Sequence, residues 1–424
     1  MAKNKIAGRL YLYLVQIVFI TISGCNNDNN GQIRLEPLNK STGENSISVE
    51  KSIPIIDIDT TDAEKINVPK DIFQSTLDFK KLIKEFHFAG LETNDKSIIG
   101  SINKILSDSV FYFIHDKDNN KIFRFNFQGK FLNQVGTTGN GPQEFVEAWD
   151  ISLDKSNNLI SVLDLKGRKI VRYTYDGRYI DSNPMYFFYT QHEYDNGYLI
   201  LRTGKSNNIS APLVSSFELV IAHQNQVPIK KAFPFPEKMN SYTTENPLRK
   251  FNNTIYYHHP FSNFIWMVKN KNLDAPIKLS FQKNGWPDHI WLEGLDENEF
   301  REALSKYTYF SGNYIIADKF RFFQISAHNN SAMLFQNKDS KSIQCGGSII
   351  NAKNQLHTFL FSAPQWYRDD GYFIGIKQPY ELVQWRDYIL KNDNNILTSE
   401  EKKILNSINE SDNPIIVTYT LNNF

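Results

Sequence analysis

The residues that could carry out chemistry include a glycine-rich run, GTTGNG, from Gly136 to Gly141. A phosphate-binding loop would end in Gly-Lys-Ser or Gly-Lys-Thr, and a dinucleotide-binding loop would open a helix. This run does neither, because Pro142 and the strand-like segment AWDISL follow it. We therefore interpret the run as a turn between structural units, in which glycines supply positive φ angles.

Histidines and carboxylates do not occur at the spacings of a metal site or a catalytic motif. His258 and His259 are adjacent in a predicted strand, so their side chains should point to opposite faces. Asp116 and Asp164 recur 48 residues apart, which is more typical of a turn-capping carboxylate than of a catalytic group. No catalytic pair can be chosen without geometry; the candidates are Glu144, Asp150, Asp369 and Asp370. The sequence therefore assigns no catalytic residue, no metal site and no cofactor.

Two segments contain more aromatic rings than a strand needs: residues 185–194 (MYFFYTQHEY) and 365–373 (QWYRDDGYF). Packing between sheets is one use for these rings, and an exposed face that stacks on sugars or grips peptides is another. For a ligand surface, the residues that we select from these segments are Trp366, Tyr367, Arg368 and Tyr189.

The first 25 residues have the parts of a bacterial export signal. Positive residues precede an apolar stretch from Leu10 to Ile22, and the sequence ISGC follows and ends at Cys25. The apolar stretch is shorter than the roughly 20 residues of a membrane-spanning helix. The ending resembles a lipobox, in which the cysteine is acylated. We predict a signal peptide over residues 1–24, lipid attachment at Cys25 and a flexible tether to residue 76.

Composition places the rest of the 424-residue chain among folded proteins. It is 41% hydrophobic, and 47 Lys and Arg residues against 46 Asp and Glu residues leave a net charge of +1. No overall field therefore favours nucleic acid, and any partner must recognise a local surface. Two cysteines are too few for a disulfide framework.

A repeat of 48 residues organises the remaining sequence. The segment KIFRFNFQGKFL begins at Lys121 and KIVRYTYDGRYI begins at Lys169, and each is an alternating strand followed by a glycine-centred hairpin. Similar units can be counted near Lys121, Lys169, Phe217, Ile265, Ser331 and Pro414. A repeat of this length built from short strands is typical of a β-propeller blade.

Helical patterns and a spare strand account for the remaining segments. Capping-box sequences predict helical insertions over about 289–308 and 380–409, whereas HTFLF (357–361) is predicted to be a strand. The apolar segment 79–91 precedes the first full unit and has no unit of its own. We expect it to pair into the last blade and close the ring.

The chain resembles the six-bladed β-propeller lipoproteins of Bacteroides-type bacteria, whose blades are similar to NHL repeats. The segments that carry the resemblance are AGLETNDKSIIG (89–100), KIFRFNFQGKFLNQVG (121–136), GTTGNGPQEF (136–145) and NPIIVTYTL (413–421). The resemblance implies an all-β fold, a six-bladed propeller over residues 77–424, and an outer-membrane location. It supplies no reaction.

Two functions of different classes remain open at this stage. The first is a membrane-anchored binding or scaffolding protein of the cell envelope, for example in nutrient capture, with a glycan, a peptide or an envelope protein as its partner. The second is a propeller-type hydrolase or lyase with an acidic or metal site at the channel mouth, because propellers support both classes.

Overall fold

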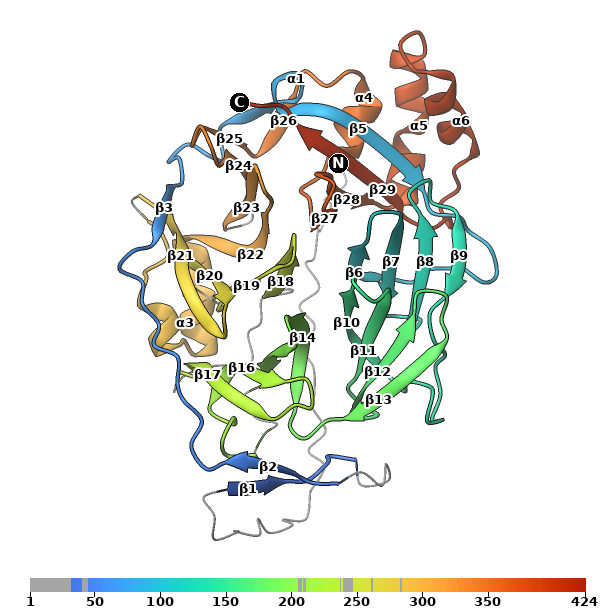
Figure 1. The fold of residues 1–424 in the computed structure, drawn as a ribbon. Coiled ribbons are helices and arrows are strands. Elements are labelled where there is room, and N and C mark those ends of the chain that lie inside the picture. Colours follow the sequence, from blue (N-terminus) through green and yellow to red (C-terminus); the bar gives the residue numbers. More distant parts are fainter. Residues whose placement is uncertain are drawn as a thin grey trace.

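The computed structural model describes residues 32–39, 45–204, 208, 211–236, 238, 247–260, 262–282, 284–328 and 330–424. The predicted signal peptide (1–24) and Cys25 lie outside these residues. Within them the chain forms six antiparallel sheets arranged in a ring, as Figure 1 shows. The predicted fold class, an all-β six-bladed propeller, is confirmed. Among the described residues, no helix is both long enough and apolar enough to cross a membrane.

Each blade has four main strands, which follow one another from the innermost to the outermost. Blade 1 consists of β6 (Ile102–Ser107), β7 (Phe111–Asp116), β8 (Lys121–Asn126) and β9 (Phe131–Gln134). Blade 2 consists of β10 (Ala148–Asp154), β11 (Leu159–Asp164), β12 (Lys169–Thr174) and β13 (Tyr179–Pro184). Blade 3 consists of β14 (Tyr189–Asp195), β15 (Tyr198–Thr203), β16 (Phe217–His223) and β17 (Pro228–Pro234).

The other three blades follow the same order. Blade 4 consists of β18 (Leu248–Phe251), β19 (Thr254–Tyr257), β20 (Phe264–Lys269) and β21 (Asn272–Ser280). Blade 5 consists of β22 (Thr308–Ile316), β23 (Phe320–Ala327), β24 (Asn330–Asn337) and β25 (Ile343–Gly346). Blade 6 consists of β27 (Trp366–Tyr367), β28 (Phe373–Lys377), β29 (Ile415–Leu421) and β5 (Ile83–Gly90).

The six repeat units found in the sequence all fall on the third strand of a blade. These strands are β8, β12, β16, β20, β24 and β29. A third strand is paired on both edges and packed on both faces, so its apolar residues are the most regularly spaced in each blade. The repeat count therefore predicted the number of blades correctly.

The ring is closed by a strand from the opposite end of the sequence. β5 pairs antiparallel with β29, with Ile416 opposite Ala89 and Thr418 opposite His87. The expected pairing of segment 79–91 into the last blade is confirmed, although its first residues form a helical turn, α1 (Phe79–Leu82). Blade 6 thus joins the two ends of the propeller and leaves no gap in the ring.

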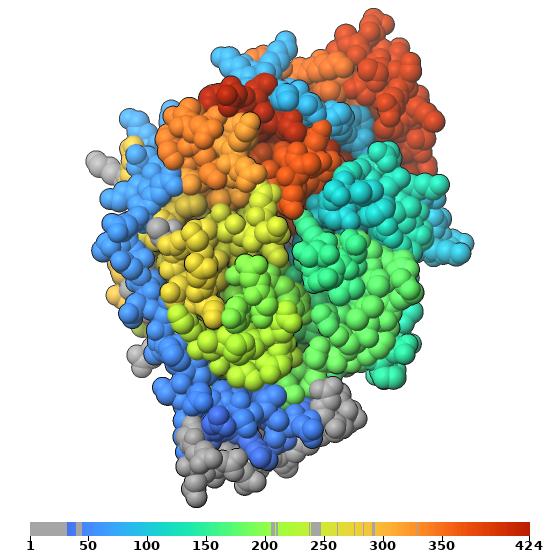
Figure 2. Space-filling model, viewed as in Figure 1, coloured from blue at the N-terminus to red at the C-terminus, as the bar shows by residue number. Residues whose placement is uncertain are grey.

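The predicted tether to residue 76 is wrong for the described part of that range. Residues 45–78, which we call the belt, follow the outer edges of blades 3, 4 and 5 (Figure 2). Within the belt, β3 (Glu64–Asn67) pairs parallel with β21, and β4 (Thr76–Asp78) pairs with β26 (Ser348–Ile350). Apolar belt residues such as Ile66 are buried, so the belt adds to the core. Ahead of it, β1 (Gln32–Leu35) pairs with β2 (Ile47–Glu50).

Both predicted helical insertions are present. α2 (Ile290–Glu293) and α3 (Glu297–Lys306) fill the first, and α5 (Pro379–Asp393) and α6 (Ser399–Ser407) fill the second. The predicted strand HTFLF is wrong, because this segment belongs to α4 (Gln355–Leu360). The Asn354 side chain caps α4 by accepting a hydrogen bond from the His357 N–H.

The two faces of the ring differ in their connections. We call the face at which the innermost strands begin the entry face, and the opposite one the exit face. Because strands alternate in direction, exit-face connections join first to second and third to fourth strands, and all are short, as at 108–110 and 155–158. Entry-face connections include 281–307, 347–365 and 378–414, which contain α2–α3, α4 and α5–α6. Loops on a rigid scaffold are the usual carriers of function.

Candidate ligand site at the entry face

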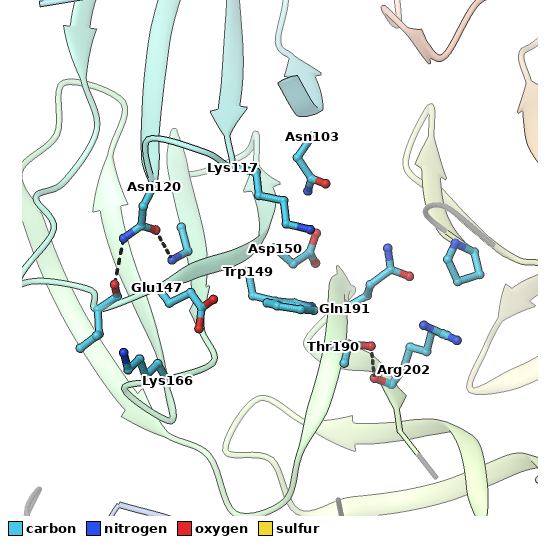
Figure 3. A pocket seen from close by; sticks show the side chains of 13 residues that line it. Asn103, Lys117, Asn120, Glu147, Trp149, Asp150, Lys166, Thr190, Gln191 and Arg202 are labelled. Atoms are coloured by element: carbon cyan, nitrogen blue, oxygen red, sulfur yellow. Dashed lines mark hydrogen bonds between the residues drawn. The ribbon is translucent and has the colours of Figure 1, made fainter. Parts of the chain in front are cut away.

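A cavity of about 450 Å³ opens at the entry face over blades 1, 2 and 3 (Figure 3). It is lined by the first residues of the innermost strands, including Asn103 of β6, Trp149 of β10 and Gln191 of β14. Lys117 and Lys166 reach it from the hairpins that join the second and third strands of blades 1 and 2. Its size is within the usual range for small-molecule sites.

The indole ring of Trp149 lies at the centre of the cavity. Figure 3 shows the ring between Glu147 and Gln191, with Lys117 above it. The Lys117 ammonium lies 5.4 Å from the ring centroid, within the range of a cation–π contact. Trp149 is partly exposed although its strand is largely buried. The cavity therefore combines one flat aromatic surface with a rim of charged and amide side chains.

Blade turns fix the backbone around this ring. Asn120 accepts a hydrogen bond from the Ala148 N–H at 2.7 Å and donates one to the Val146 carbonyl at 2.8 Å. The Asp164 carboxylate accepts hydrogen bonds from the N–H groups of Val146 and Glu147. The segment before Trp149 is thus held from two hairpins, so the ring position is set before any ligand binds.

A buried charge network lies beneath the cavity. Lys104 of β6 donates hydrogen bonds to Asp150 at 2.9 Å, Glu193 at 3.2 Å and the Ile151 carbonyl at 2.8 Å. Burial alone would raise the pKa of Asp150, but Lys104 and His192 outweigh it and hold this pKa well below its usual range. Burial alone would lower the pKa of Lys104, but Asp150 and Glu193 raise it. The network joins the innermost strands of blades 1, 2 and 3 by charge pairs.

The same network contains a serine–histidine–aspartate chain. Ser161 Oγ lies 2.7 Å from His192 Nε2, and His192 Nδ1 lies 3.1 Å from Asp150 Oδ2. These are the residue types and distances of a nucleophilic triad. Ser161, however, is only 3% exposed and is not among the residues that line the cavity. A substrate could not reach its hydroxyl group, so the chain serves to connect β11 of blade 2 with β14 of blade 3.

A second buried ion pair supports the far wall of the cavity. Arg202 lines the cavity and donates two hydrogen bonds to Glu218 Oε1, at 2.9 and 2.8 Å. His259 Nε2 lies 3.1 Å from the other oxygen of Glu218. Burial lowers the pKa of His259, so the histidine adds little positive charge to this pair. The charge of Arg202 is therefore neutralised inside the fold.

The four residues selected for a ligand surface do not form one. Tyr189 is fully buried in blade 3, and its hydroxyl donates to Gln226 at 3.1 Å, so it presents nothing to a ligand. Arg368 stacks 3.7 Å from the centroid of the Phe127 ring and is bonded to Asp370. Trp366 and Tyr367 line a cavity of about 70 Å³ inside the channel, toward the exit face. Aromatic enrichment in these segments mainly reflects packing between blades.

The other candidates from the sequence have structural partners. The carboxylate of Asp116 accepts hydrogen bonds from the N–H groups of Gly100 and Ser101, and Asp164 does the same in blade 2. Both cap turns, as their 48-residue recurrence predicted. His258 and His259 were expected within a strand, but β19 ends at Tyr257 and the two histidines follow it. Both are buried. In the part of the chain that the structure describes, no three metal-ligating side chains converge.

The glycine-rich run is confirmed as a turn between blades 1 and 2, but the expected positive φ occurs only at Gly136 and not at Gly139 or Gly141. Glu144 Oε2 accepts a hydrogen bond from the Gly141 N–H at 2.8 Å, and a Cβ on Gly139 would lie 2.0 Å from the same oxygen. The glycines thus leave room for an internal carboxylate. Asp369 and Asp370, the remaining carboxylate candidates, pair with Lys155 and Arg368 at the exit face.

Sequence reasoning missed Trp149, Lys117 and Gln191 as site residues. The available signal was positional, because Trp149 lies at the start of the segment AWDISL, which begins a blade. Residues at the starts of innermost strands surround the channel mouth in any propeller. A large aromatic side chain at that position was therefore a stronger indication than an aromatic-rich run elsewhere.

Comparison with known families identifies the group to which the chain is related. A family described as a domain of unknown function, DUF4934, matches residues 63–420. The chain belongs to the DUF4934 family. The match includes residues 63–78 of the belt and all six blades except Leu421, the last residue of β29. No curated protein matches the chain.

A solved structure agrees with the fold of this DUF4934 member. A Bacteroides fragilis protein described as exported is 17% identical, with a TM-score of 0.67 over 85% of this chain and 100% of that one. A DUF4221-family protein from Bacteroides vulgatus is 9% identical, with a TM-score of 0.43 over 80% of this chain and 97% of that one. The first similarity supports the propeller fold alone; the second is too low to add to it.

Proposed function

We propose that this DUF4934 protein is a lipid-anchored binding protein of the cell envelope that captures a saccharide at its entry face. The observation that carries the proposal is the partly exposed ring of Trp149 at the centre of a cavity with a polar rim. The hairpins of blades 1 and 2 support it, because they place Lys117, Asn120 and Lys166 around the cavity on a rigid scaffold.

Saccharides match this combination of groups better than other small ligands do. A sugar ring has an apolar C–H face that can lie on an aromatic ring, and its edge carries hydroxyl groups that need hydrogen-bond partners. Asn103 Nδ2 lies within hydrogen-bond distance of His115 Nδ1, at 3.2 Å, and Asn103 Oδ1 is not part of this contact. Lys166 is exposed at the rim and makes no ion pair with any described residue. Glu147 and Gln191 add further polar contacts.

The hydrolase or lyase alternative receives less support from the cavity. Two carboxylates line the cavity, Glu147 and Asp150. Lys104 and His192 pair with Asp150 and keep it ionised, so it cannot donate a proton near neutral pH. Glu147 would then act without a second acid or base, whereas glycoside hydrolysis uses two carboxylates. A capture role needs no such pair.

The anchor is part of the proposal and rests on the lipobox-like sequence ending at Cys25. Acylation there would hold the propeller at the outer membrane. Replacement of Cys25 by Ser is expected to move the protein from the membrane fraction to the soluble fraction of the producing cells. If the Cys25→Ser protein stays in the membrane fraction, the lipid anchor is ruled out.

Saccharide binding can be tested on the full chain in detergent, first on a glycan array and then by calorimetry with the strongest hit. Trp149→Ala should weaken binding at least tenfold, which corresponds to about 1.4 kcal/mol. Ile180→Ala is the control, because Ile180 is exposed on β13, the outermost strand of blade 2, and does not line the cavity. Equal affinity for the two variants, or no glycan bound at all, would reject the site. Turnover of the bound glycan would favour the enzyme alternative.

A further inference from the structure

One helix of the described structure has an unusual concentration of exposed aromatic side chains. Tyr380, Trp385 and Tyr388 of α5 are 48%, 50% and 49% exposed, and no other large aromatic side chain among those described is as exposed. Scattered exposed apolar residues need no explanation, but a cluster on one element marks an interaction surface. Tryptophan and tyrosine are also enriched at the energetic centres of protein interfaces.

The cluster is presented on a rigid support. The rings of Trp385 and Tyr388 meet edge to face with centroids 5.6 Å apart. Leu382 and Ile389, about one turn before and one turn after Trp385, are buried in the core and fix this part of α5 to the propeller. Arg386 donates hydrogen bonds to the carbonyl groups of Leu405 and Ile408, so α6 holds α5 in place. A preorganised aromatic face loses little side-chain entropy when a partner binds.

The charges beside the aromatic pair form a self-complementary pattern. Glu381 lies one helical turn before Trp385, and Lys391 lies about one turn after Tyr388, on the same side of α5. If two α5 helices meet antiparallel across a twofold axis, Trp385 faces Tyr388 of the second copy. The same register brings Glu381 opposite Lys391 of the second copy. Lys391 is exposed and makes no ion pair with any described residue.

We propose that α5 is a self-association surface and that two copies of this chain pair through it as an isologous dimer. A twofold contact requires one patch to complement itself, and the order acid, aromatic, aromatic, base along α5 meets that requirement. The proposal does not depend on the ligand of the entry-face cavity. Because the α5–α6 connection leaves the ring at the entry face, each dimer would carry two cavities and could bind a repeating polymer at two points.

The oligomeric state of the full chain in detergent tests the proposal, by sedimentation equilibrium over a range of protein concentrations. The wild-type chain should dimerise below about 100 µM, and Trp385→Ala should raise the dissociation constant at least tenfold. Lys391→Glu should weaken the dimer, because it places like charges opposite each other. Lys403→Glu, an equal charge change on exposed α6, is the control and should leave the dimer intact.

A charge exchange separates a specific contact from general repulsion. The double variant Glu381→Lys with Lys391→Glu should dimerise more strongly than Lys391→Glu alone, because each new charge again faces its opposite. Circular dichroism checks that α5 still forms, since Glu381 also belongs to its capping box. A wild-type chain that stays monomeric throughout, or a dimer unaffected by Trp385→Ala, overturns the proposal whatever the double variant does.

Discussion

The entry and exit faces of this propeller are built from the same six blades but differ in nearly every feature that matters for binding. At the entry face three connections are long and contain helices, and a cavity opens over a buried charge network. At the exit face the connections are short, and the charges pair near the surface, as Lys155 does with Asp369. The repeat thus determines the ring, and the entry-face ends of blades 1, 2 and 3 form the cavity.

The largest expected effect concerns the network beneath the entry-face cavity. Lys104→Met should lower the free energy of unfolding by about 3–5 kcal/mol, because Asp150 and Glu193 would stay buried without their cation. Urea denaturation measures the change. Lys166→Met, at the exposed rim of the same cavity, should change stability by less than about 0.5 kcal/mol. A loss below about 1 kcal/mol for Lys104→Met would show that water or rearrangement compensates the carboxylates.

Acid should lower the free energy of unfolding, because a histidine is buried near the entry face. Burial lowers the pKa of His115 to about 4, against 6.5 for an ordinary histidine. The unfolded chain therefore binds this proton first, and the stabilisation present above pH 6.5 is lost as the pH falls toward 4, by about 3 kcal/mol. Urea midpoints at pH 7 and pH 4 measure it. His258, whose pKa burial lowers to about 3, acts in the same direction, so His115→Gln should flatten the pH dependence only in part.

Two glycines allow a matched test of the two faces. Gly136 at the entry face has a φ of +67°, and a Cβ there would lie 2.7 Å from the Tyr173 ring. Gly197 at the exit face has a φ of +88°, with nothing within 4 Å of such a Cβ. Gly136→Ala should cost about 3 kcal/mol and Gly197→Ala about 1 kcal/mol, because only the first adds crowding to backbone strain. Equal losses in thermal denaturation would mean that the Tyr173 ring moves aside freely.

A small effect is expected for the ion pair at the exit face. Lys155 and Asp369 are 34% and 39% exposed, so solvent screens their attraction. Lys155→Ala should change the free energy of unfolding by less than about 1 kcal/mol and leave saccharide affinity unchanged. A change in affinity from this variant would show that the exit face takes part in binding, and would contradict the functional difference between the faces.

The sequence predicted the ring better than the site, for physical reasons. Residues such as Ile122 and Ile170 repeat because third strands are packed on both sides, and this regularity survives even where identities change. Ring closure by segment 79–91 could be predicted because this apolar segment belongs to no repeat unit and must pair with a strand of another blade. The site was not predicted, because the role of Trp149 depends on its position at the channel mouth. That position is known only once the innermost strand is assigned.

The wrong predictions have equally specific causes. Tyr189 belongs to an aromatic-rich run that packs between blades 2 and 3, where large rings fill the hydrophobic core. HTFLF is too short for its apolar pattern to distinguish a strand from a helix, although Asn354 was available as a capping signal for α4. The belt was taken for a tether because several of its buried residues, among them Val49 and Ile66, are single apolar positions with a polar residue on each side.

The closure of blade 6 also constrains how this protein reaches its folded state. β5 occupies residues 83–90 and its partner β29 occupies residues 415–421, so β5 is synthesised early and has no partner until the chain is almost complete. Contacts between such distant segments are slow to form, and unpaired strand edges are prone to aggregate in the meantime. Folding of this propeller should therefore depend on protection of the early segments until the final strand is available.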